Sequence, residues 1–316
     1  MNKDKKIATR VSYGKALAAL GEKYEDVVVL DADLAVATKT DIFRDKFPHR
    51  HIDCGIAECN MMGVAAGIAT TGRVAFASSF AMFAAGRAFE QIRNSIGYPG
   101  LNVKIAATHA GISVGEDGAT HQCNEDIALM RTIPGMVVIS PCDDIEAKAA
   151  VEAAYHKEGP VYLRFGRMPV PIVNDHSEYQ FQLGKAVLLK EGTDVTLVAT
   201  GLCVAEAIEA AEVLEKEGIS AEVMNIHTIK PLDEEAILQS AFKTKRVITI
   251  EEHSVIGGLG SAVADVISAK NAARVLKIGV EDIFGQSGSG GELIKEYGLD
   301  SKSIYEKVKI FLGSNN

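Results

Sequence analysis

The pattern of apolar and polar positions predicts a chain of alternating strands and helices. In the first half, apolar runs without alternation recur, which is typical of parallel strands covered on both faces. These runs are Val27–Asp31, Val74–Ser78, Val103–His109, Met136–Ile139 and Val161–Phe165. Stretches with helical periodicity are found at Ala8–Glu22, Ala81–Ser95 and Ile145–His156. This alternation predicts an α/β fold with a parallel sheet.

A second α/β unit is predicted after a linker. Pro169, Pro171 and the polar run Asn174–Gln180 have the composition of a connecting segment. Beyond them, strands are predicted at Ala186–Leu189, Val195–Ala199, Ala221–Asn225, Arg246–Ile250 and Val275–Ile278. Helices are predicted at Val204–Glu217, Glu234–Phe242, Ser261–Lys270 and Ser301–Phe311. We therefore expect two consecutive parallel-sheet α/β domains, residues 1–172 and 183–316, joined by residues 173–182.

The composition fits a globular protein and argues against several other classes. The 316 residues are 47% hydrophobic and 24% charged, with a formal net charge of -9. The basic residues form no long cluster, so we expect no nucleic-acid binding. No uncharged run reaches the roughly 18 residues that a membrane span needs, and the N-terminus lacks the apolar core of a signal peptide. Together with irregularly spaced cysteines, these features predict a cytoplasmic protein with reduced thiols and no membrane partner.

The polar residues of greatest interest stand where the predicted strands end. Among them are Asp31, Asp33, Ser78, His109 and Arg164. Ligands of parallel sheets bind beyond the carboxyl ends of the strands. We therefore expect the ligand site at this edge of the first sheet.

The segment Thr108–Gln122 is a glycine-rich loop with two histidines, one aspartate and one glutamate. Flexible backbone with clustered titratable groups is typical of an active-site loop. An ordinary loop that satisfies its own backbone is the alternative, but so many reactive side chains at one strand end favour function. A metal site is not expected, because His109 and His121 form no helical i, i+4 pair.

The stretch Asp53–Met62 places Glu58 in the first turn of a predicted helix, among apolar residues. A carboxyl group in such a place can exchange a proton with a bound heterocycle. The alternative is a glutamate that only caps the helix. Phe80 and Phe83, spaced i, i+3, either pack in the core or form an aromatic wall for a flat cofactor ring.

Three motifs, in their order and spacing, resemble the pyrimidine-binding half of transketolase. They are Gly-Ile-Ala-Glu-Cys-Asn-Met (Gly55–Met61), Ser-Phe-Ala-Met-Phe-Ala-Ala-Gly (Ser79–Gly86) and the loop Thr108–Gln122, with its Thr-His and Gly-Glu-Asp-Gly-Ala-Thr-His-Gln. The second half resembles the transketolase C-terminal domain, so the resemblance covers essentially the whole chain. It implies a thiamine diphosphate pyrimidine-binding fold followed by that domain. The implied reaction transfers a two-carbon ketol unit from a ketose phosphate to an aldose phosphate.

The resemblance also implies which residues hold the cofactor. Glu58 matches the glutamate that bonds N1′ of the aminopyrimidine of thiamine diphosphate and so promotes loss of the thiazolium C2 proton. Phe80 and Phe83 match residues that pack around the aminopyrimidine. Asp33 matches a residue of the cofactor pocket at the dimer interface.

Further residues match the sugar-phosphate site of the family: Arg10, His109, Asp117, His121 and Arg164. Of these, Asp117 and His121 match contacts to the hydroxyl groups of the donor sugar. The other three match the phosphate end, with Arg167 as the alternative to Arg164. Ala37 stands where the family has a phosphate-binding serine, so that contact is not expected here.

The chain departs from the family at the diphosphate site. It has no Gly-Asp-Gly, and its only Asn-Asn is the terminal Asn315-Asn316. It therefore resembles the C-terminal subunit of a split transketolase. The resemblance implies that a separate N-terminal subunit holds the diphosphate and its Mg or Ca ion, and that this chain itself has no metal ligands. We expect two copies of each subunit, with this chain dimerising inside the heterotetramer.

Three other families are alternatives. The 1-deoxy-xylulose-5-phosphate synthase family shares the Gly-Glu-Asp-Gly motif, and Phe89-Glu90-Gln91-Ile92 slightly favours that family. Thr108-His109, however, fits transketolase better. The β subunit of a 2-oxoacid dehydrogenase component has the glutamate but lacks the two-histidine loop. A non-catalytic binding or regulatory paralogue is disfavoured, because the residues matched to catalysis are all present.

Overall fold

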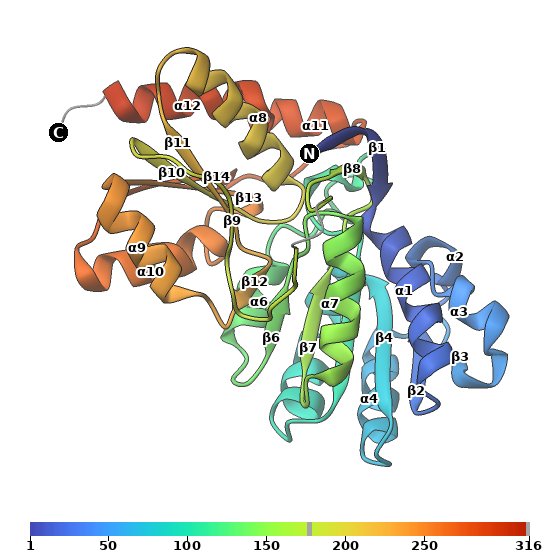
Figure 1. Ribbon diagram of the computed structural model, residues 1–316. Helices are drawn as coiled ribbons and strands as arrows, with labels where there is room; N and C mark the ends of the chain where they lie inside the picture. Colours follow the sequence, from blue (N-terminus) through green and yellow to red (C-terminus); the bar gives the residue numbers. More distant parts are fainter. Residues whose placement is uncertain (176–178, 314–316) are drawn as a thin grey trace.

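The computed structural model describes residues 1–175 and 179–313, which form two α/β units (Figure 1). Part of the predicted linker and the Asn315-Asn316 pair lie outside the described residues. Each unit is built on its own, mostly parallel sheet, and a third, small sheet has two strands. This architecture confirms the fold class expected from the apolar runs.

The first sheet has the strand order β12-β6-β7-β5-β4-β2-β3. Its strands are β2 (Val27–Asp31), β3 (His51–Asp53), β4 (Val74–Phe80), β5 (Val103–Thr108), β6 (Val137–Ile139), β7 (Val161–Arg164) and β12 (Thr228–Lys230). Neighbouring strands are parallel, except that β12 pairs antiparallel with β6. The second half of the chain thus extends the first sheet by one strand.

Strand β2 shows why the apolar runs lack polar positions. Val27 and Val29 pack in the core that includes residues of α1 (Thr9–Lys23) and α7 (Asp144–His156). Val28 and Leu30 pack in the opposite core, with residues of α4 (Glu58–Ala69). Because successive side chains of a strand point to opposite faces, a sheet covered on both faces requires an apolar residue at every position.

Shorter helical segments complete the first unit: α2 (Ala35–Thr38), α3 (Asp41–Lys46), η1 (Pro48–Arg50), η4 (Ile112–Val114) and α6 (Asp126–Thr132). The predicted helix Ala81–Ser95 is not a regular α-helix. It contains two π-helical turns, η2 (Met82–Arg87) and η3 (Ile92–Gly97), with the short α5 (Phe89–Gln91) between them. Such wide turns are frequent at functional sites.

The second sheet has the order β14-β13-β10-β11-β9, with only β9 antiparallel to its neighbour. Its strands are β9 (Val187–Lys190), β10 (Val195–Ala199), β11 (Ala221–Asn225), β13 (Arg246–Ser254) and β14 (Arg274–Val280). Its helices are α8 (Cys203–Lys216), α9 (Glu234–Thr244), α10 (Leu259–Lys270), α11 (Gly290–Glu296) and α12 (Ser301–Gly313). Within residues 1–175 and 179–313, no helix has both the length and the apolar character needed to cross a membrane.

The interpretation of Pro169 and Pro171 as linker residues is wrong. Both lie in β8 (Pro169–Ile172), which pairs antiparallel with β1 (Asn2–Ala8). Two strands alone leave one edge of each unpaired, so proline residues without an N–H can be accommodated there. Strand β8 of this small sheet is the last element before the segment that connects the first unit to the second.

The start of helix α7 ties the two units together. The buried Glu146 carboxylate accepts hydrogen bonds from the Cys142 backbone N–H at 2.7 Å and from the Asn225 side chain, at the end of β11, at 2.8 Å. The Tyr179 hydroxyl donates to the same carboxylate at 2.8 Å. One side chain therefore bonds its own helix start, the connecting segment and the second sheet.

We expect Glu146→Ala to destabilise the protein by about 3 kcal/mol or more, because it leaves buried donors without an acceptor. Glu152→Ala, on the same helix, is the matched control, since Glu152 forms an exposed ion pair with Lys23 and such pairs contribute about 0–1 kcal/mol. Urea denaturation of both variants measures the difference. Equal losses would show that the junction at Glu146 does not stabilise the fold.

Candidate functional site

Glu58 is the first residue of α4, and its side chain is only 3% exposed. The N-cap residue is Ala57, and no side chain caps this helix, so Glu58 is not a capping glutamate. Arg87 Nη1, from the end of η2, donates to Glu58 Oε2 at 3.0 Å. The site therefore contains a buried carboxylate held by one arginine.

Aromatic and histidine rings continue from this ion pair. The Arg87 guanidinium lies over the Phe83 ring at 4.8 Å. Phe83 stacks with Phe80 at 6.0 Å between ring centroids and meets the edge of His121 at 5.2 Å. Phe80 stacks in turn on His109 at 3.8 Å. The structure thus brings Glu58, Phe80, Phe83, His109 and His121, all predicted site residues, into one continuous row.

His109 is buried at the end of β5 and links the rings to an arginine. Arg10 Nη1 lies 3.3 Å from His109 Nε2, and the Thr108 hydroxyl lies 2.9 Å from Nδ1. Because arginine only donates, Nε2 must be the acceptor, and the ring proton belongs on Nδ1. Burial first, and then the charge of Arg10, lowers the pKa of His109 to about 3. This histidine is therefore a neutral hydrogen-bonding group.

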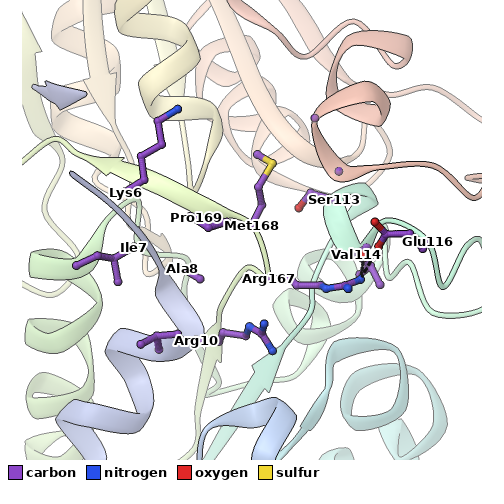
Figure 2. Close-up of a pocket in the computed structure, with 13 residues that line it drawn as sticks. Lys6, Ile7, Ala8, Arg10, Ser113, Val114, Glu116, Arg167, Met168 and Pro169 are labelled. Atoms are coloured by element: carbon purple, nitrogen blue, oxygen red, sulfur yellow. Dashed lines mark hydrogen bonds and ion pairs between the residues drawn. The ribbon is translucent and has the colours of Figure 1, made fainter. Parts of the chain in front are cut away.

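A cavity of about 510 Å³ lies beyond Arg10. Figure 2 shows the side chains of Arg10 and Arg167 reaching the same end of it. Burial, and next the charge of Arg167, lowers the pKa of Arg10. The row of rings therefore leads from a buried carboxylate to a cavity with two arginines.

Arg164 does not reach this cavity. It is 6% exposed, and its Nε donates to Asp126 at 2.8 Å while Nη2 donates to the Glu252 backbone carbonyl at 2.8 Å. Arg167 Nη1, in contrast, lies at the cavity, bonded to the Val114 carbonyl and to Glu116 at 3.0 Å. Of the two arginines that the resemblance offered for the phosphate end, Arg167 lines the cavity and Arg164 does not.

The glycine-rich loop carries the remaining predicted sugar residues. Asp117 is exposed, and its carboxylate lies 3.6 Å from Arg167 Nη1. His121 is half-buried, with Nδ1 2.9 Å from the Thr120 hydroxyl. The loop thus spans the distance from the arginine cavity to Phe83.

Asp33 is exposed, in the turn that follows β2. Its backbone has φ 58°, and its N–H donates to Asp53 Oδ1 at 3.0 Å. Neighbouring Asp31 is buried and accepts bonds from Thr38 and Thr40, both at 2.8 Å. Burial still raises the pKa of Asp31 to about 6. Asp31 therefore shapes the turn that presents Asp33.

The residues present fit the aminopyrimidine end of thiamine diphosphate but not its diphosphate end. A buried carboxylate beside the half-buried Phe83 ring offers an acceptor and a flat apolar wall. Within the part of the chain that the structure describes, no group of three or more His, Cys, Asp or Glu side chains could hold a metal ion.

Sequence reasoning missed Arg87 and left Glu252 without a role. Arg87 stands four residues after Phe83 in a helix-period segment, and that spacing could have placed its charge over the ring. Glu251 and Glu252 are consecutive acids at the end of an apolar strand run. Their partners lie far away in the sequence, so no local pattern identifies them.

We expect the His109 imidazole to stay neutral from about pH 9 down to about pH 4, because its pKa is shifted downward, away from the usual value of about 6.5. NMR of histidine-labelled protein measures this, with His109→Gln to assign the resonance. A titration midpoint near the usual value would show that the ring is exposed to water rather than buried.

Residues 5–172 match the transketolase pyrimidine-binding domain, and residues 184–304 match the transketolase C-terminal domain. The chain is 52% identical over 301 residues to a "putative transketolase C-terminal section" of Methanocaldococcus jannaschii, covering 95% of this chain and 94% of that protein. It is 45% identical to the "6-deoxy-6-sulfo-D-fructose transketolase subunit SqwH" of Clostridium sp., covering 93% and 91%.

A solved structure agrees with these matches. A "split gene transketolase, inactive beta4 tetramer" has a TM-score of 0.90 to this chain at 53% identity, covering 97% of this chain and 98% of that one. Both family domains, in the same order, thus occur here and in relatives of similar length. The chain belongs to the transketolase family, whose cofactor is thiamine diphosphate, and consists of the family's pyrimidine-binding and C-terminal domains.

Proposed function

We propose that this chain is the C-terminal subunit of a two-subunit transketolase. It would transfer a two-carbon ketol unit from a ketose phosphate to an aldose phosphate, in the pentose phosphate pathway of the cytoplasm. The observation that carries the proposal is the continuous row from the buried Glu58 carboxylate to the cavity at Arg10 and Arg167. The relatives named as a subunit and as a C-terminal section support it.

Glu58 is the proton-handling residue at the aminopyrimidine end. Its carboxyl group would share a proton with the ring nitrogen N1′ across a hydrogen bond, with Phe80 and Phe83 as the wall beside the ring and Asp33 at the rim of the pocket. Bound thiamine diphosphate supplies the nucleophilic carbon and the electron sink for breaking a carbon–carbon bond of the ketose. Arg87 holds the Glu58 carboxylate in place at 3.0 Å.

The cavity is the place for the anionic end of the sugar. Arg10 and Arg167 offer forked donors, which suit a phosphate, and His109 would serve the phosphate end by orienting Arg10, from whose Nη1 its Nε2 accepts. The Clostridium relative is named for a sulfonated sugar, and a sulfonate is also an anion. Asp117 and His121 would bond the sugar hydroxyls between the cavity and the cofactor, with His121 close enough to the Phe83 ring to act at the reacting carbons.

The diphosphate and its Mg or Ca ion belong to a separate N-terminal subunit. Among the described residues no suitable metal-binding group exists, and a diphosphate needs a hard cation or a cluster of donors. We propose a heterotetramer with two copies of each subunit, in which this chain dimerises.

The test of this assembly is calorimetric titration of thiamine diphosphate with magnesium, first into the isolated chain and then into its mixture with the N-terminal subunit. We expect binding, and turnover of xylulose 5-phosphate with ribose 5-phosphate, only in the mixture. Micromolar cofactor binding and sugar turnover by the isolated chain would overturn the two-subunit proposal.

We expect Glu58→Gln to abolish most turnover in the reconstituted enzyme while the fold persists. Glutamine keeps the size and one acceptor, but it cannot exchange the proton in the same way. Loss of a proton-transfer or electrostatic group typically costs about 2–5 kcal/mol of transition-state stabilisation. Rates at saturating cofactor measure the loss, and near-normal turnover would remove Glu58 from the mechanism.

Arg10→Ala and Arg167→Ala should each raise KM for a phosphorylated ketose about 10–100-fold, since bonds to a charged group contribute about 1.5–3 kcal/mol. KM for an unphosphorylated ketose is the internal control and should change little. Arg164→Ala should instead lower stability by about 3–5 kcal/mol, because it strands the buried Asp126. Equal effects on both kinds of ketose would make the cavity arginines structural.

A further inference from the structure

The loop that carries Asp117 and His121 has little regular structure of its own. At its base, the Gly111 N–H donates to the Cys123 carbonyl at 2.9 Å. Inside it lie one short 3-10 turn, η4, and a few turn bonds such as Gly118 N–H to Gly115 O at 3.1 Å. Such a loop needs external contacts to keep one conformation.

Arg167 of the first unit supplies some of these contacts, to the Val114 carbonyl and to Glu116, and the second unit supplies others. Glu252, from β13, accepts the Ser113 backbone N–H at 2.6 Å, and Gln122 Nε2 donates to the Gln286 carbonyl at 2.9 Å. The approach is so close that a Cβ atom on Gly111 would lie 2.4 Å from Glu252 Cδ. Glycine at 111, with φ 80°, is therefore what lets the carboxylate reach the loop backbone.

The end of β13 is itself fixed to the first unit. Arg164 Nη2 donates to the Glu252 carbonyl at 2.8 Å while Arg164 Nε is paired with Asp126. Two residues on, the Ser254 N–H donates to the Asn124 carbonyl at 2.7 Å. The Glu252 side chain thus projects from a backbone held on both sides of the loop base.

We propose that Glu252 is a positioning residue, by which the C-terminal domain holds the loop 111–122 in the shape that presents Asp117 and His121 to the sugar. The Glu252 carboxylate fixes the Ser113 backbone, and the loop carries that constraint to the two side chains. This role rests on the proposed function, because the sugar contacts of Asp117 and His121 belong to it. Glu252 itself touches no reacting atom.

The chemistry of the position agrees with this role. Glu252 is 3% exposed, and burial, partly opposed by Arg164, raises its pKa to about 7. Burying a carboxyl group costs free energy unless hydrogen bonds compensate it, so an apolar side chain would suit this position better if packing were its only role. Its neighbour Glu251 is a buried carboxylate with another task, since it accepts the N–H groups of Leu259 and Gly260 at 2.6 and 2.7 Å, at the start of α10.

The first test is hydrogen exchange of the loop amides in the isolated chain, which needs neither cofactor nor substrate. We expect Glu252→Ala to speed exchange at residues 112–118 about tenfold or more, and Glu252→Gln, which keeps an acceptor oxygen, to restore most of the protection. Glu251→Ala is the matched control and should speed exchange only near α10. Should Glu252→Ala not fold, Glu252→Asp, with its shorter reach, replaces it. Unchanged loop exchange, or the same increase in both alanine variants, would overturn the proposal.

The second test uses the enzyme reconstituted with its N-terminal subunit. We expect Glu252→Ala to raise KM for the ketose phosphate about tenfold, with a smaller change in kcat and unchanged affinity for thiamine diphosphate. Glu252→Gln should recover most of the KM, and Glu251→Ala should leave it unchanged. Faster loop exchange with an unaltered KM would refute the positioning role. Absence of sugar turnover in every reconstituted sample, wild type included, would refute the proposed function, and loop exchange would still decide whether Glu252 holds the loop.

Discussion

The parallel register of the first sheet is the constraint on which the site depends. Asp31 pairs with Asp53 on one side and with Ser78 on the other, and Phe80 pairs with Thr108. Because these strands run in one direction, their carboxyl ends meet at one edge, and the residues that follow them become neighbours. Phe80 and His109 can stack only because β4 and β5 end together. The row from Glu58 to Arg10 is a consequence of this shared edge.

Most of the fold was predictable because burial on both faces leaves a strong local signal. The strands Val27–Asp31, Val195–Ala199 and Ala221–Asn225 occur with the predicted bounds. The missed strands, such as β8 and β12, are short and pair with segments far away in the sequence. Their conformation is decided by the partner strand rather than by their own residues, so no local pattern could reveal them.

Which side chains lie together at this edge of the sheet was in large part predictable, whereas the partner of each side chain was not. The sequence placed Glu58, His109 and His121 near strand and helix ends, but it could not show Arg87 beside Glu58. Arg164 and Arg167 are three residues apart and equally basic. Arg164 is the last residue of β7 and bonds Asp126, whereas Arg167 lies three residues beyond the strand and lines the cavity. Tertiary packing alone distinguishes a structural arginine from an accessible one.

Arg10 and Arg167 both line the cavity at the end of the row, and Arg167 is paired there with Glu116 at 3.0 Å. The net charge is -9, yet Arg10 and Arg167 lie close enough for one to lower the pKa of the other. His109 contributes no charge that would add to this repulsion, because burial keeps it neutral. An anion entering the cavity would relieve the repulsion between the guanidinium groups, and a local positive field in a low-dielectric wall attracts anions over longer range. Burial thus keeps His109 neutral and lowers the pKa of Arg10, so any charge that the row brings to the cavity comes from its arginines and their acidic partners.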